Sequence, residues 1–432
     1  MPLDISPPHR PPKAERAAAA AAYRRVRDAS LALARRFPIE DWMLQSMEEA
    51  SPIKWNLAHT TWFFETFVLR ARAPQEPVFD PAFGYLFNSY YEQIGDRHPR
   101  ARRGLLSRPD AQTVVAYRAH VDERMIALLE SADRDETAAL APILDLGLAH
   151  EEQHQELLIT DIQHALSTNP TLPTALSGGE RGLGAAPPID WVGFDGGLVE
   201  IGWDGRGFAF DNEGPRHKAH LEPFALASRS VTNGEFAEFI DDGGYDDCRL
   251  WLADGWARRC DENWSAPLYW RREDDAAPWS AFSLFGVRAI DPAAPVAHVS
   301  FYEAAAFAEW AGARLPREAE WECASREADA HGAVLDGAAL RAPQPALAAP
   351  GRVSQMFGDV WEWTASAYSP YPGFRAAAGP VGEYNGKFMS SQMVLRGGSC
   401  ATPRNHVRAT YRNFFPPEAR WQFSGLRLAR DA

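Results

Sequence analysis

Apolar residues in the first 166 positions recur mostly at helical spacing, in four long stretches separated by turns. The first stretch is rich in Ala, Arg and Leu, which are strong helix formers. The second begins at Ser51-Pro52, an N-cap residue followed by proline, and is apolar on nearly every side, as expected inside a bundle. The stretches predict helices over residues 14–36, 51–71, 111–131 and 137–166, and hence a four-helix bundle.

Residues 72–109 connect the second and third helices, and a connection of this length in a compact bundle is usually functional. A Pro-, Gly- and Ser-rich stretch is the clearest domain boundary in the chain. Beyond it turns are frequent, and only 233–241 and 302–312 have convincing helical patterns. We therefore expect a multidomain α and α+β protein with a disordered tail (1–13), a helical bundle (14–166), a linker (167–190) and a loop-rich α+β domain (191–432).

Charge and composition narrow the class of protein. The 432 residues carry a formal charge of −14 without a basic stripe, which argues against nucleic acid and against an anionic membrane as partners. No apolar run approaches the roughly 18 residues of a membrane-spanning helix, and the first residues lack the basic and apolar regions of a signal peptide. Four scattered cysteines without a C-x-x-C pair indicate reduced thiols, so we expect a cytoplasmic protein.

The candidate chemistry of the bundle centres on His150 and His154 in the fourth predicted helix. Because they are four residues apart, their imidazoles point to the same side of the helix and can bind one metal ion. The neighbouring Glu151, Glu152 and Glu156 are candidates to accept hydrogen bonds from the imidazole N–H groups. The alternative is a pair of histidines that only hydrogen-bond to these glutamates.

His59, on the second predicted helix, is the best candidate for a third ligand. The apolar surroundings predict that it is buried. A buried histidine is more often hydrogen-bonded in a core than bound to a metal, so the assignment depends on whether His150 and His154 converge on it.

Five motifs in the second half resemble, in order, the formylglycine-generating-enzyme (sulfatase-modifying-factor) family. They are VTNGEF (231–236), VSFYEA (299–304), RLPREAEWE (314–322), GDVWEWT (358–364) and RGGS (396–399). The resemblance implies that family's loop-rich, C-type-lectin-like fold, held by Arg, Glu and Trp side chains. It does not carry the activity over, because Cys400 alone stands where the family is expected to have a pair of reactive cysteines.

The first half resembles a DinB-like bundle through WNLAHTTWFFE around His59 and HEEQHQE over 150–156. The two halves together are similar to the iron-dependent sulfoxide synthases of ergothioneine biosynthesis, the hercynine oxygenases. That resemblance implies a non-haem Fe(II) cofactor bound by His59, His150 and His154, with open positions for substrates and O2. The implied reaction joins a cysteine-type thiol to C2 of the imidazole of hercynine and oxidises the sulfur to a sulfoxide.

The same resemblance implies contacts to hercynine. Gln153 matches a position expected to hydrogen-bond its imidazole, and Asn413 would help to hold its betaine end. Phe414 and Phe415 offer aromatic faces to the quaternary ammonium group. The alternatives are a helix-surface amide at Gln153 and core packing of the two phenylalanines.

One departure from the family bears on the thiol substrate. The branch that uses γ-glutamylcysteine resembles RNWDYP where this chain has RNFFPP (412–417), so an acidic residue is missing. NSYY (88–91) instead resembles the branch that uses free L-cysteine, in which paired loop tyrosines line the active site. Tyr90 and Tyr91 are therefore candidate catalytic groups that donate a proton or hydrogen atom, and aromatic packing is the alternative.

Arg97 and Arg100 are candidates to bind the carboxylate of the thiol substrate, since a guanidinium group binds a carboxylate through two N–H groups. A solvated basic turn that also contains Arg102 and Arg103 is an equal alternative.

Free L-cysteine is the preferred thiol, and γ-glutamylcysteine is the alternative. A further relative, the 5-histidylcysteine sulfoxide synthase of the ovothiol pathway, typically has an appended methyltransferase domain that this sequence does not show. A non-catalytic binding module is a different class of function. The loss of any of the three histidines or of the loop tyrosines would favour it, and all of them are present.

Overall fold

The computed structural model describes residues 13–179, 185–274, 276–326, 328, 332–347, 349–379, 382 and 385–432. The chain divides into two compact units, Met1–Ala165 and Leu166–Ala432. The predicted disordered tail lies outside the described residues except for Lys13, and so does the 180–184 portion of the predicted linker.

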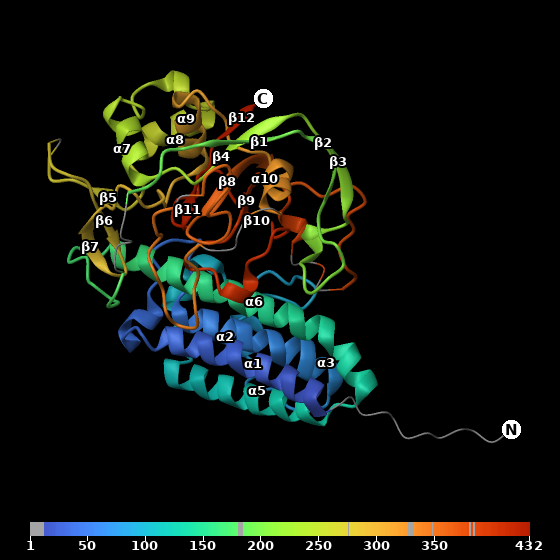
Figure 1. Ribbon diagram of the computed structural model, residues 1–432. Helices are drawn as coiled ribbons and strands as arrows, with labels where there is room; N and C mark the ends of the chain where they lie inside the picture. Colours follow the sequence, from blue (N-terminus) through green and yellow to red (C-terminus); the bar gives the residue numbers. More distant parts are fainter. Residues whose placement is uncertain are drawn as a thin grey trace. The chain divides into compact units, whose positions relative to one another are not determined.

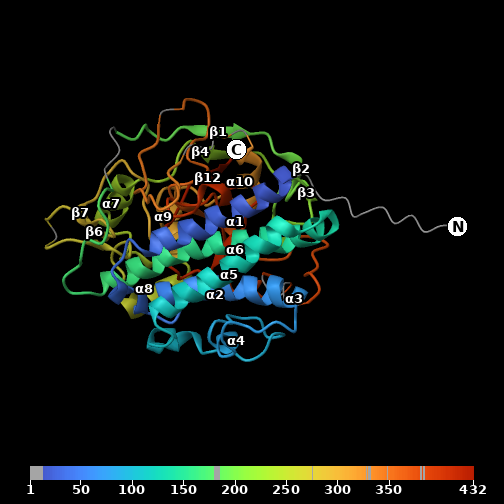
Figure 2. The ribbon, with the colours of Figure 1, turned by 90° about the horizontal axis from the view of Figure 1, so that it is seen from below.

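The first unit is a helical bundle whose long helices lie side by side in both Figure 1 and Figure 2. They are α1 (Lys13–Ala34), α2 (Ile53–Phe64), α5 (Ala111–Ser131) and α6 (Arg134–Ser167). A π-helical turn (Glu65–Leu69) and a last turn, α3 (Arg70–Arg72), extend α2. The predicted four-helix bundle is confirmed, and every residue of α2 is buried, as its apolar pattern requires.

The connections of the bundle contain short helical turns. A 3-10 turn (Ile39–Met43) lies between α1 and α2. The chain between α3 and α5 is largely irregular, as predicted, and forms the short helix α4 (Phe83–Leu86) and a 3-10 turn (Arg100–Leu105).

A buried carboxylate joins three of the long helices. Glu151 of α6 accepts hydrogen bonds from Arg27 (2.8 Å) and Ser30 (2.6 Å) of α1 and from Arg118 of α5, and all four side chains are buried. Burial alone would raise the pKa of Glu151, but Arg118 and Arg27 lower it to about 2. These ion pairs restrict how α6 can turn about its axis, and so which way its other faces point.

Short strands and irregular segments make up most of the second unit. Within the described residues the strands form four small sheets. The largest has the order β10-β9-β8-β11 (Asn413–Phe415, Met393–Arg396, Trp361–Ala367, Ser424–Gly425) and is antiparallel except between β11 and β8. The others are β1-β4-β12 (Trp191–Phe194, Phe224–Ala227, Ala429–Asp431), β2-β3 (Gly197–Ile201, His217–Leu221) and β5-β6-β7 (Trp270–Arg271, Ser280–Ser283, Gly286–Ala289).

The longer helices of this unit are α7 (Asn233–Asp241), α8 (Ala253–Glu262), α9 (Phe301–Trp310) and α10 (Glu318–Ser325). Short 3-10 turns lie at Asp211–Glu213, Cys248–Leu250, Gly386–Phe388 and Arg404–His406. The predicted helix at 233–241 is confirmed, and the one at 302–312 is α9, which ends two residues earlier.

The sequence pattern does not predict α8 or α10, and the structure explains why. Most side chains of α8 are exposed, and its glycine, Gly255, is there because Tyr302 lies 2.7 Å from where a Cβ would be. In α10 the buried face includes Glu320 and Glu322, which pair with Arg314 and Arg396. Charged residues on a buried face hide the periodicity on which a sequence prediction depends.

Buried pairs of Arg and Glu hold the loops of the second unit together. Glu362 accepts hydrogen bonds from Arg427 (2.8 Å) and from the indole of Trp321 (2.7 Å), and all three side chains are fully buried. Similar pairs are Arg229–Glu235, Arg396–Glu322, Arg412–Glu318 and Arg420–Glu303. The predicted Arg, Glu and Trp lattice is therefore confirmed.

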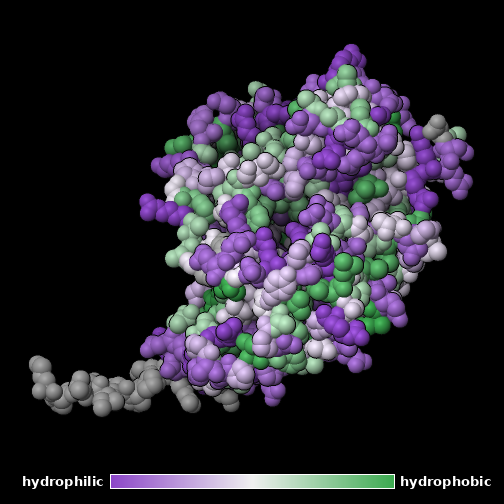
Figure 3. Space-filling view, turned by 180° about the vertical axis from the view of Figure 1, so that it is seen from behind, coloured by the Kyte–Doolittle hydropathy of each residue, from purple (hydrophilic) through white to green (hydrophobic). Residues whose placement is uncertain are grey.

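Among the described residues, no helix is both long and apolar enough to cross a membrane. The face in Figure 3 mixes hydrophilic with hydrophobic residues, and hydrophilic residues are spread over all parts of it.

We expect Glu151→Gln to lower the free energy of unfolding by about 3–5 kcal/mol, because two buried guanidinium groups lose their carboxylate. Denaturant titration followed by circular dichroism measures this. Because the folded-state pKa of Glu151 is depressed, its contribution is present above the unfolded-state pKa and is lost as pH falls through about 2.

Glu130→Gln is the matched control, since Glu130 forms an exposed pair with Arg24, and it should change stability by less than about 0.5 kcal/mol. Equal effects of the two variants would contradict a bundle held by the Glu151 pairs.

Candidate metal centre

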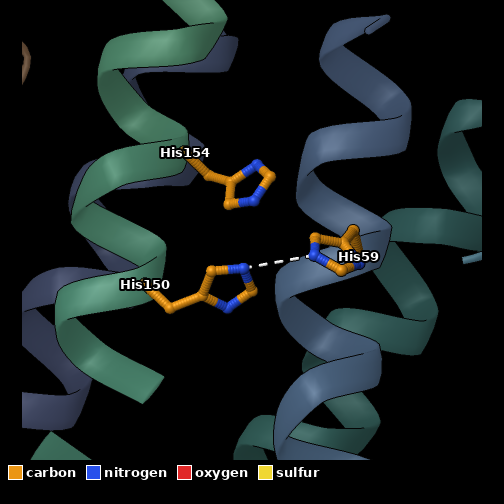
Figure 4. A group of neighbouring side chains, drawn as sticks. All are labelled: His59, His150 and His154. Atoms are coloured by element: carbon orange, nitrogen blue, oxygen red, sulfur yellow. Dashed lines mark hydrogen bonds between the residues drawn. The ribbon is translucent and has the colours of Figure 1, made fainter. Parts of the chain in front are cut away.

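Three histidine side chains from two helices converge in the first unit. His59 comes from α2, and His150 and His154 come from successive turns of α6. One nitrogen of each ring lies within 4.8 Å of the others, and the ring centres are 4.6–4.9 Å apart. Figure 4 shows the rings pointing into the space between the two helices. The structure thus brings together the three histidines that the sequence singles out.

The convergence depends on a close approach of α6 to α2 at Gly147, one turn before His150. A Cβ at this position would lie 2.6 Å from the ring of Phe64 and 2.9 Å from that of Phe63. Glycine inside a helix costs about 1 kcal/mol relative to alanine, so a packing requirement explains its presence. The sequence contains Gly147 but gives no sign that a neighbouring helix needs it.

The outer nitrogens of two rings have defined partners. Nδ1 of His59 lies 2.6 Å from the carbonyl oxygen of Phe87, which can only accept, so this nitrogen carries the proton. Nδ1 of His154 lies 2.8 Å from Oδ1 of Asn56, and the Asn56 amide is oriented by its N–H bonds to the carbonyls of Ser51 and Pro52. Each ring is therefore left with a lone pair on Nε2, the form that binds a metal.

The prediction that a neighbouring glutamate accepts the imidazole N–H is wrong for His154, and the acceptor at His59, for which no partner was predicted, is not a glutamate either. A backbone carbonyl and an asparagine amide take that place. Glu151 instead pairs with Arg27 of α1 and Arg118 of α5. Two residues that matter to the site, Asn56 and Phe87, were therefore not identified from the sequence, because a carbonyl has no sequence signal and Asn56 lies in a different helix from its partner.

The electrostatic surroundings keep the three rings neutral. Nε2 of His59 and Nε2 of His150 are only 3.2 Å apart. Burial, followed by the neighbouring histidines, lowers the pKa of His59 and of His154 well below the usual value, and Arg103 acts in the same direction on both. Burial also lowers the pKa of His150 to about 3. At neutral pH the cluster therefore offers lone pairs and not protons.

Aromatic rings surround the cluster on the α2 side. Trp55, His59 and Trp62 lie on one face of α2 because they are three or four residues apart. The rings of Trp55 and Trp62 stack on His59 at 4.7 Å and 5.8 Å, and Phe63 lies 5.0 Å from His150. These rings hold the imidazoles in place and make the surroundings largely apolar.

Tyr90 and Tyr91 lie next to these rings of Trp55, Trp62 and Phe63, which we call the aromatic wall. Tyr91 is fully buried, and its ring is 5.7 Å from Trp62 and 4.6 Å from the half-buried Tyr90. Asn88 shapes the loop, because its side chain accepts from the Tyr91 N–H and donates to the carbonyls of Tyr91 and Gly95. The paired tyrosines thus share a wall with the histidines.

The basic turn divides into exposed and buried members. Arg97 is exposed and pairs with Glu92 at 2.9 Å, and the exposed Arg100 donates to the carbonyl of Glu49. Arg103 is buried, and its guanidinium carbon lies 3.4 Å from the centre of the Trp55 ring. From the sequence, Arg103 was grouped with the arginines of a solvated turn, because nothing in RHPRARRG (97–104) distinguishes it from its neighbours.

The other candidate residues lie in two places. Gln153 is half-buried on α6, directly before His154. Asn413, Phe414 and Phe415 form β10 of the second unit. Phe414 stacks on Tyr368 at 4.1 Å, and Asn413 accepts a hydrogen bond from the Phe414 N–H at 2.9 Å.

Two family models match this chain. Residues 22–158 match the DinB superfamily, and residues 186–346 and 348–432 match the sulfatase-modifying factor enzyme 1-like domain. The hercynine oxygenase of Mycolicibacterium thermoresistibile is 36% identical over 88% of this chain and 87% of its own length, and that of Mycolicibacterium smegmatis is 34% identical over 88% and 91%. The formylglycine-generating enzyme of Streptomyces coelicolor is 30% identical over 53% of this chain and 84% of its own length. The predicted types of domain are confirmed.

The metal-free protein should lose stability as pH falls from about 6.5 toward about 3, because the unfolded state gains a proton at His150 that the folded state resists. Denaturant titrations in the presence of a chelator, repeated over this pH range, measure the effect. The free energy of unfolding of the His150→Gln variant should depend less steeply on pH. Identical slopes for the variant and the original protein would contradict a buried, neutral His150.

Proposed function

This chain belongs to the hercynine oxygenase family, and on that premise we propose that it is an Fe(II)- and O2-dependent sulfoxide synthase of ergothioneine biosynthesis. The proposed reaction joins the thiol of L-cysteine to C2 of the hercynine imidazole and oxidises the sulfur to a sulfoxide. The observation that carries the proposal is the convergence of His59, His150 and His154 in a chain 36% identical to a hercynine oxygenase.

The donor set fits Fe(II). Three neutral imidazoles, two of them with a protonated Nδ1 fixed by a partner, supply three nitrogen ligands and leave positions for substrates. When bound, Fe(II) would supply the redox chemistry with O2 and a position for a thiolate. Imidazole nitrogens also bind other divalent ions, so iron is proposed because the chain belongs to the hercynine oxygenase family.

The residues of the bundle have proposed roles in orientation and proton transfer. Gln153 would donate to or accept from the hercynine imidazole and so hold C2 toward the thiol. Tyr90 or Tyr91 would supply a proton or hydrogen atom through its phenol group. What supports the tyrosines is their place on the aromatic wall that also holds His59.

The remaining substrate contacts are proposed from family membership. Asn413 would bind the betaine end of hercynine, and Phe414 and Phe415 would face its quaternary ammonium group. Arg97 and Arg100 are proposed for the carboxylate of the thiol substrate. Both are exposed, which leaves their guanidinium groups accessible to an incoming anion.

Free L-cysteine is the proposed thiol substrate, and γ-glutamylcysteine is the alternative. Phe415 stands where the branch that uses γ-glutamylcysteine is expected to have an acidic residue. We also propose a cytoplasmic location. It is supported by the four cysteines, which are all free thiols, as is usual for proteins of a reducing compartment.

We expect the protein, reconstituted anaerobically with Fe(II) and then exposed to air with hercynine and L-cysteine, to form hercynyl-cysteine sulfoxide. Mass spectrometry identifies the product. His150→Ala should abolish it, because one of three metal ligands is lost.

The parallel reaction with γ-glutamylcysteine tests the choice of thiol. Product only with that thiol would keep the enzyme class and reject the interpretation of Phe415. An iron-loaded protein that couples neither thiol would reject the sulfoxide-synthase proposal.

A further inference from the structure

A buried cation lies behind the histidine cluster. Arg103 is 3% exposed, and its guanidinium group donates to the hydroxyl oxygens of Ser51 (2.9 Å) and Ser89 (3.2 Å). Its Nε–H has no hydrogen-bond partner in the part of the chain that the structure describes. Among those same residues no carboxylate forms an ion pair with it. Burying such a charge is costly, so its presence calls for a reason.

Trp55 separates this cation from His59. The guanidinium carbon lies 3.4 Å from the centre of the indole, and the imidazole of His59 stacks on the same indole at 4.7 Å with 13° between the planes. Two groups this close to one ring centre cannot share a face, so they lie on opposite faces of Trp55. The charge is therefore within about 8 Å of the His59 ring, with an apolar ring between them.

A buried acidic residue, Asp161, offsets this charge only in part. Asp161 is buried and accepts a hydrogen bond from the Ser51 N–H at 2.8 Å, on the same residue that Arg103 binds. Its other oxygen, Oδ1, has no partner among the described residues. Burial raises the pKa of Asp161 to about 7, so much of it is uncharged at neutral pH, whereas a guanidinium group stays protonated.

We propose that Arg103 sets the ligand preference of the metal centre, because its buried positive charge behind Trp55 favours anionic ligands, thiolates or carboxylates, over neutral ones. The inference rests on the proposed metal site. Three neutral imidazoles leave the charge of a divalent metal unbalanced, and Arg103 adds to it, so an entering anion is attracted by both. Arg103 acts through its field and is not a catalytic residue.

The test uses the full-length protein loaded with Co(II), whose visible absorption reports ligands that join the metal, and azide as the anionic probe. Arg103→Met should raise the azide dissociation constant about twentyfold, the effect expected for unit charges about 8–10 Å apart at an effective dielectric constant near 20. Arg103→Lys keeps the charge and should stay close to the original protein. The exposed neighbour in the same turn gives the matched control, Arg102→Met, which should leave azide binding unchanged.

Asp161→Asn tests the same idea in the opposite direction and does not depend on Arg103→Met folding. Measured at pH 8, where Asp161 is mostly ionised, it removes a negative charge and should tighten azide binding several-fold.

The proposal is overturned if Arg103→Met binds azide as Arg102→Met does, if Arg103→Lys loses as much affinity as Arg103→Met, or if Asp161→Asn weakens azide binding. Failure of the original protein to bind Co(II) at the histidines would instead reject the metal site itself, so the two proposals fail in distinguishable ways.

Discussion

The proposed metal centre depends on how closely α6 packs against α2. Two of the proposed ligands come from a single helix, where their spacing is fixed by the backbone, but His59 has to be brought to them from another helix. Gly147 allows the close approach, and the pairs of Glu151 with Arg27 and Arg118 fix the rotation of α6. Functional groups must be held to within about half an ångström, which explains why so many fully buried side chains support three imidazoles.

The same packing decides the protonation of the three histidines. A histidine in water titrates near neutral pH, whereas burial lowers the pKa of all three rings, and at His59 and His154 the neighbouring histidines and Arg103 lower it further. Partners on the outer nitrogens of His59 and His154 then leave each Nε2 as an acceptor. The helical bundle thus provides a set of nitrogen donors that needs no proton loss before a metal binds.

The sequence could predict whatever depends on local periodicity or on a family motif. The long helices, the histidine pair and the types of domain are of this kind, because each is encoded within a short stretch. Gly147, Asn56 and Arg103 were not identified, since what each one does is defined by a residue more than 45 positions away. Helix α10 was not predicted for a related reason: its buried glutamates are stabilised only by their ion pairs with Arg314 and Arg396.

Anaerobic Fe(II) titration of the full-length protein would show whether the three histidines bind iron. We expect one tightly bound iron per chain, and loss of that iron when His59 or His154 is replaced by Ala, with no loss in the exposed control His120→Ala. Retention of iron with unchanged affinity in both ligand variants would contradict the three-histidine centre.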